Sequence, residues 1–107
     1  MGFKYTKVTS YKWPVTVELP DNGQYKKETF TAIFKKVGRA SFEDLDDAAT
    51  ESLIFDVLLG WEDITDEDGK PIPFSDDFKT ELLDDTYFLR GVMAGYLDSL
   101  QGAPAKN

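Results

Sequence analysis

Two runs of alternating apolar and polar residues flank Asn22-Gly23, and this arrangement restricts what the first third of the chain can form. The runs cover Lys12–Leu19 and Gln24–Lys36. Alternation places every second side chain on one face of a strand, and Asn-Gly favours the tight turn of a hairpin. The pattern therefore predicts a β-hairpin. Its apolar face comprises Trp13, Val15, Val17 and Leu19, followed by Phe30, Ala32 and Phe34.

An isolated hairpin is only marginally stable in water, so other elements must cover its apolar face. Beyond Gly38 the apolar residues recur at helical spacing, which predicts three to four α-helices. The sequence thus indicates an α+β fold, with residues 3–9 as a candidate third strand. A chain of 107 residues fits one domain, here 1–102 with Gly102 as the final C-cap, and a flexible tail over 103–107.

Helix starts are marked by side chains that accept hydrogen bonds from free backbone N–H groups. Ser41, with Asp44 three residues later, forms a capping-box pattern and predicts a helix start, with helical spacing continuing into residues 53–59. Ser75 predicts the start of a short helix that ends near Asp85.

A last helix is predicted from about Thr86 to Leu100. Gly91 and Gly95 lie one turn apart on it. Each glycine in a helix costs ~1 kcal/mol relative to alanine. We therefore expect another backbone to approach this side of the helix.

The segment 53–59 is apolar almost all round, with Asp56 as its single charged residue. Such a helix is either buried on every side or covered by a partner. Burial in the core is the default, but a domain of this size has little room to enclose a helix completely. The candidate partner-binding residues are Leu53, Phe55, Val57 and Leu59.

The segment 59–75 predicts a loop that folds back on itself. Asp68-Gly69 favours a turn, and two prolines keep the chain after it extended. Large apolar residues occur on both sides of this turn, so the loop is expected to pack against the helices. The candidate structural residues of this loop are Trp61, Ile64, Gly69, Pro73 and Phe74.

The chain contains neither cysteine nor histidine. Disulfides, thiolate nucleophiles and ordinary zinc sites are therefore excluded, and the commonest general base is missing. We expect no enzymatic activity and no cofactor. No apolar run approaches the ~20 residues that a membrane-spanning helix needs.

The acidic stretch around Asp66 and Asp68 invites comparison with a calcium-binding EF-hand loop. With Gly69 at the sixth position of that motif, the first and twelfth positions become Ile64 and Ser75, which are not ligands. A solvated acidic turn is the better interpretation, and no metal is expected. The adjacent acidic pairs elsewhere fit helix starts and surface charge better than acid–base catalysis.

The net charge of −8 is unevenly distributed. Residues 1–39 carry eight Lys and Arg against three Asp and Glu, and residues 40–107 carry four against seventeen. This asymmetry fits either one body with a basic and an acidic face, or head-to-tail self-association. Nucleic-acid binding by the basic hairpin is disfavoured by the overall charge, whereas an acidic protein that mimics DNA is permitted by it.

The pattern from Gly60 to Ser75 resembles a family of tail assembly chaperones from long-tailed bacteriophages. Its motifs are Gly60-Trp61, Ile64, Asp66-Glu67-Asp68-Gly69, Pro71-Ile72-Pro73-Phe74-Ser75, Leu82-Leu83 and Tyr96. The hairpin end over residues 30–36 is similar too. The resemblance spans most of residues 12–100, although only the loop is specific.

The resemblance implies a non-catalytic, self-associating protein in the cytoplasm of an infected bacterial host, absent from the mature virion. Its partners would be the tape measure protein and the tail tube protein. Two alternatives stay open. One is a small acidic inhibitor or DNA mimic that binds a host protein, and the other is a carboxylate-dependent enzyme.

Overall fold

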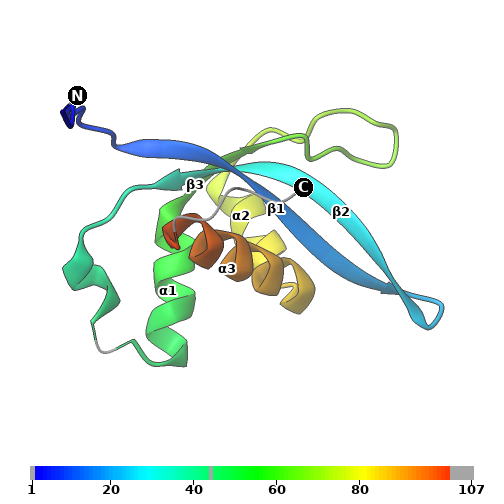
Figure 1. The fold of residues 1–107 in the computed structure, drawn as a ribbon. Coiled ribbons are helices and arrows are strands. Elements are labelled where there is room, and N and C mark those ends of the chain that lie inside the picture. Colours follow the sequence, from blue (N-terminus) through cyan, green and yellow to red (C-terminus); the bar gives the residue numbers. More distant parts are fainter. Residues whose placement is uncertain (1, 44, 102–107) are drawn as a thin grey trace.

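The computed structural model describes residues 2–43 and 45–101, and it shows an α+β fold. An antiparallel sheet, in the order β1-β2-β3, has helices packed along one side (Figure 1). The strands are β1 (Ser10–Asp21), β2 (Gln24–Lys35) and β3 (Leu58–Glu62). The helices are the 3-10 helix η1 (Arg39–Phe42), α1 (Asp47–Val57), α2 (Asp76–Leu83) and α3 (Thr86–Leu100).

The predicted hairpin is confirmed. Asn22 and Gly23 form its turn with φ angles of 52° and 81°, the left-handed geometry that a two-residue hairpin loop requires. Val15 pairs with Phe30, and both face the helices from the buried side of the sheet. The alternation that predicted the strands therefore also identifies their buried face.

The third strand is not where the sequence suggested. Residues 2–9 form no strand, and the third strand is β3, in which Trp61 pairs with Ala32 of β2. The expected helix over 53–59 accordingly ends at Val57, and Leu58 already belongs to β3. A short apolar run has no periodicity that separates strand from buried helix, so tertiary contacts decide its conformation.

The helix start predicted at Ser41 is also wrong. Ser41 lies in η1, and no side chain caps that element. α1 begins after Asp46, whose carboxylate accepts a hydrogen bond from the Ala49 N–H at 2.7 Å. The carboxylate satisfies a free N–H there, which fixes the helix start five residues later. Asp44, the second member of the predicted capping box, lies outside the described residues.

The starts of α2 and α3 are as predicted. Ser75 Oγ accepts a hydrogen bond from Phe78 N, and Asp85 Oδ1 accepts bonds from Tyr87 N and Phe88 N. The predicted C-cap Gly102 and the tail over 103–107 lie outside the described residues. None of the described helices is long and apolar enough to cross a membrane.

α3 packs directly on β1 through its two glycines. A Cβ at Gly91 would lie 2.8 Å from the Thr16 carbonyl oxygen, and one at Gly95 would lie 2.9 Å from Val15 Cγ2. The close approach predicted from the glycine spacing is confirmed. Nearby, burial raises the pKa of Tyr96 to about 12, with a smaller contribution from Tyr11, which disfavours ionisation of its hydroxyl.

Gly91→Ala tests this contact. Alanine normally stabilises a helix by ~1 kcal/mol relative to glycine, but overpacking against a backbone oxygen costs roughly 1–3 kcal/mol. We expect a net loss of about 1 kcal/mol in the free energy of unfolding, measured by urea denaturation. Gly38→Ala is the control, because its Cβ would meet nothing within 4 Å. A higher stability of Gly91→Ala would contradict the close approach.

Candidate functional site

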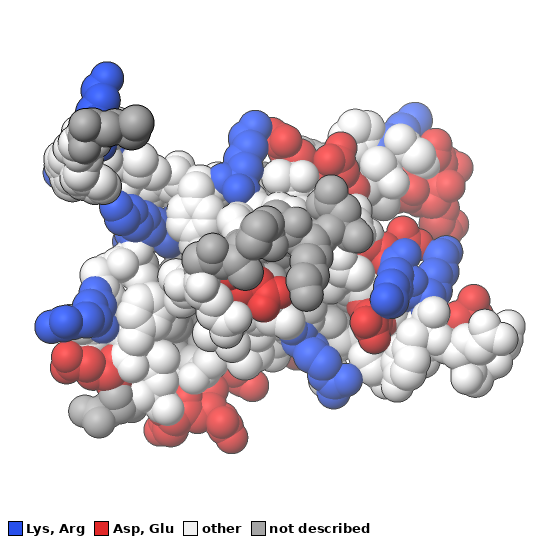
Figure 2. Space-filling view, in the orientation of Figure 1, with Lys and Arg blue, Asp and Glu red and all other residues white. Residues whose placement is uncertain are grey.

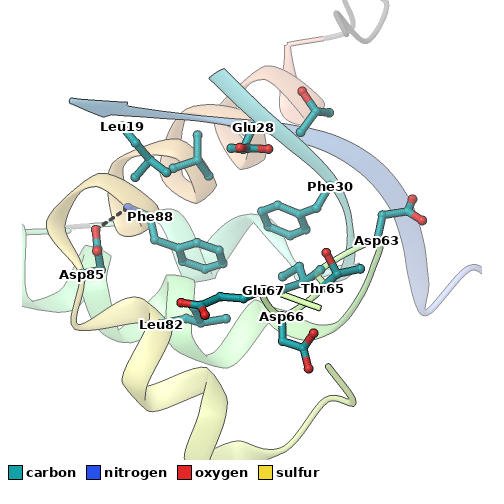
Figure 3. Close-up of a pocket in the computed structure, with 13 residues that line it drawn as sticks. Leu19, Glu28, Phe30, Asp63, Thr65, Asp66, Glu67, Leu82, Asp85 and Phe88 are labelled. Carbon is teal, nitrogen blue, oxygen red and sulfur yellow. Dashed lines mark hydrogen bonds between the residues drawn. The ribbon is translucent and has the colours of Figure 1, made fainter. Parts of the chain in front are cut away.

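A cavity of about 490 Å³ opens at the end of the core nearest the hairpin turn (Figure 3). It lies between the hairpin, the loop that follows β3, and the junction of α2 with α3. This volume is within the ~300–1,000 Å³ of typical ligand pockets. Its apolar lining consists of Val17, Leu19, Phe30, Ile64, Leu82 and Phe88.

The floor of the cavity is an edge of the hydrophobic core. The rings of Phe30 and Phe88 are stacked, with centroids 5.3 Å apart and planes 9° apart. Both residues are more than nine-tenths buried. A group entering the cavity therefore meets fixed aromatic surface from two elements, β2 and α3.

The rim of the cavity is acidic. The lining includes five carboxylates and no Lys or Arg: Glu28, Asp63, Asp66, Glu67 and Asp85. Glu28 is exposed and lies 3.1 Å from the Lys26 ammonium, a pair that surface exposure makes weak. Asp66 and Asp85 accept backbone hydrogen bonds through Oδ1. The site combines apolar surface with negative charge, which favours an apolar group that carries a neighbouring positive charge.

Figure 2 shows how charge is distributed on one face of the molecule. Asp and Glu side chains, including a group over the loop after β3, are interspersed with Lys and Arg side chains. This face is therefore mixed in sign, and the acidic rim is a local feature.

The loop after β3, which forms one wall of the cavity, is held in shape by hydrogen bonds within the loop. Asp66 Oδ1 accepts hydrogen bonds from the N–H groups of Asp68 and Lys70, at 2.9 and 3.0 Å. Gly69 forms the turn with φ 79°, a region that other residues rarely adopt. Beyond the turn, Ile72 N donates to Ile64 O at 2.8 Å and joins the two arms of the loop.

Trp61 fastens this loop to the body of the protein. Its Nε1 donates a hydrogen bond to Ile72 O at 2.9 Å, and its ring packs edge-on against Phe74 at 4.8 Å. Ile64, Ile72 and Phe74 are half-buried against the core. Pro73 is exposed, so it acts through its fixed backbone rather than through packing.

Lys79 of α2 is a buried residue that the sequence did not reveal as important. Its side chain is 6% exposed, and Nζ donates hydrogen bonds to Phe55 O at 2.8 Å and Leu58 O at 3.2 Å. The ammonium also lies 4.0 Å from the centroid of the Phe55 ring. Lysine is rarely buried, so the sequence alone would place Lys79 at the surface. Its contacts with the end of α1 are what show that it connects α2 to α1.

The four candidate partner-binding residues do not form one exposed patch. Val57 is fully buried, and Leu53 and Phe55 are half-buried. Leu59 is 44% exposed, but it lies in β3 instead of the predicted helix. Most of this apolar segment is therefore covered within the chain, whereas the cavity places apolar side chains beside polar groups.

The described residues contain no group of three acidic side chains placed to hold a metal ion. No protein-family model matches the chain, and neither a curated protein nor a solved structure shows significant similarity to it.

Trp61→Ala is expected to lower the free energy of unfolding by about 3–5 kcal/mol, the usual cost of removing a large buried aromatic side chain. Trp61→Phe keeps an aromatic ring and removes the Nε1 hydrogen bond, so a loss nearer ~1 kcal/mol is expected. Chemical denaturation measures both. If Trp61→Ala kept the stability of the parent protein but lost partner binding, the structural role of Trp61 would be wrong.

Proposed function

We propose that this protein is a tail assembly chaperone of a long-tailed bacteriophage, which binds the tape measure protein and promotes assembly of the tail tube. One observation carries the proposal. The segment from Gly60 to Ser75, on which the resemblance depends, supplies a wall of an open apolar cavity. The most specific part of the sequence pattern thus borders a surface suited to binding another protein.

The chemistry of the cavity suits a long helical client. Exposed apolar side chains along such a client would make it aggregate, and the Phe30–Phe88 floor offers them aromatic contact. The carboxylates of the rim favour apolar side chains with Lys or Arg nearby on the client. A net charge of −8 would keep the complex soluble.

In this proposal the protein acts without catalysis and without a cofactor or metal. It works in the cytoplasm of the infected bacterium, associates with copies of itself, and leaves before the virion is mature. The tail tube protein assembles around the client that the chaperone holds.

Co-expression with the tape measure protein encoded nearby tests the proposal. We expect the tape measure protein to become soluble and to co-purify with this chain. Glu67→Lys, which reverses one charge on the rim, should reduce the recovered client severalfold. Glu51→Lys is the matched control, because it makes the same charge change at an exposed position of α1 away from the cavity.

Three outcomes would contradict parts of this proposal. A client that stays insoluble would overturn the chaperone assignment, and competition with DNA for a host protein would support the acidic inhibitor instead. If Leu59→Ser abolished recovery of the client and Glu67→Lys left it unchanged, the binding site would be at β3 and not at the cavity.

A further inference from the structure

The segment Gly2–Thr9 is here called the arm, and its aromatic side chains are exposed to solvent. Phe3 is 90% exposed and Tyr5 is 71% exposed. The arm forms no helix or strand, and Lys4 and Lys7 alternate with its apolar residues. Its base is fixed to the sheet, because Lys36 N donates a hydrogen bond to Thr9 O at 3.0 Å. Apolar groups this exposed are typical of a surface that another molecule covers.

The arm and the cavity have complementary chemistry. The arm offers two aromatic rings with positive charges beside them, and the cavity offers aromatic floor with negative charges around it. Asp63 and Glu67 are exposed rim carboxylates, and among the described residues neither side chain takes part in a salt bridge or a hydrogen bond. Insertion of an aromatic ring would therefore bring the arm's ammonium groups to carboxylates that are free to receive them.

The arm points away from the cavity of its own chain. It joins β1 at Ser10, whereas the cavity is lined by Val17 and Leu19 near the other end of that strand. At ~3.3 Å per residue, seven residues of strand separate Ser10 from Val17 by roughly 23 Å. Figure 1 shows the arm leaving the sheet at the end opposite the hairpin turn.

We propose that the arm of one copy docks in the cavity of a second copy. Phe3 and Tyr5 are the aromatic groups that enter the cavity, and Lys4 and Lys7 contact the carboxylates of its rim. The contact joins two different surfaces, so a pair of copies keeps one free arm and one free cavity, to which further copies can bind. Such contacts produce rings or open chains. This inference rests on the self-association included in the proposed function and deepens it, because it names the two surfaces that join copies of the chain.

Analytical ultracentrifugation of the protein alone tests the contact. We expect oligomers that grow with concentration and dissociate as salt is added, because the rim contacts are between exposed charges. The double variant Phe3→Ser/Tyr5→Ser should weaken association about tenfold or more, as truncation of interface anchors does. Tyr25→Ser is the matched control, since Tyr25 is also an exposed aromatic residue, 63% exposed, but lies outside the arm and the cavity lining.

A mixing experiment identifies the cavity as the other half of the contact. The double variant Asp63→Asn/Glu67→Lys keeps its arm but loses two carboxylates of the cavity rim. Its cavity should therefore bind an arm less tightly, and the variant should be mostly monomeric. Mixed with the arm variant, which keeps its cavity, it should form a one-to-one dimer that grows no further. Both variants change exposed side chains, and thermal unfolding will show whether each remains folded.

Two results would overturn the inference. One is a parent protein that remains monomeric at all concentrations. The other is an arm variant that associates as strongly as the parent, which would assign the oligomer to another surface. Neither result depends on the tape measure protein. A monomeric parent would also contradict the self-association in the proposed function, whereas binding of the tape measure protein is tested separately by co-expression and can stand in either case.

Discussion

A single buried ammonium group connects α2 to the end of α1, at the point where the chain enters the third strand. Lys79 Nζ, held by α2, donates to two carbonyl oxygens at the end of α1. Burying a charge is costly unless it is bonded, and the C-terminal end of a helix carries partial negative charge. The aromatic face of Phe55 adds a further favourable contact. This lysine ties the point where the chain leaves α1 to α2, so the chain can pass directly into β3.

The position of β3 also determines where the cavity forms, because β3 leads into the loop that lines it. β3 presents Trp61 to the loop, and its hydrogen bond to Ile72 O holds the loop folded back on itself. Asp63, which directly follows β3, has φ 69°, a conformation that is uncommon outside glycine and therefore needs support from its surroundings. Held in this way, the loop stands beside the Phe30–Phe88 stack, and the cavity lies between them. A preformed cavity is favourable for binding, because little order has to be gained when a partner enters.

The sequence predicted those parts of the fold whose signals are local. The hairpin follows from alternation around Asn22-Gly23, the start of α2 follows from the cap at Ser75, and α3 follows from the helical spacing of its apolar residues. It failed over 58–62, where an apolar run fits helix and strand equally and where Lys79, distant in sequence, contributes to the outcome. The cavity could not be predicted from local sequence signals either, because its lining comes from four separate segments of the chain. Only the apolar and acidic character of the loop could be recognised in advance.

We propose that partners bind at the cavity rather than at the apolar segment 53–59. Hydrogen–deuterium exchange distinguishes the two sites when the complex of the arm variant Phe3→Ser/Tyr5→Ser with the tape measure protein is compared with the arm variant alone, whose cavity no arm covers. We expect slower exchange over residues 63–67 and at the start of α3, with little change in α1 and at Leu59. Slower exchange confined to α1 and β3, with the loop unchanged, would contradict it.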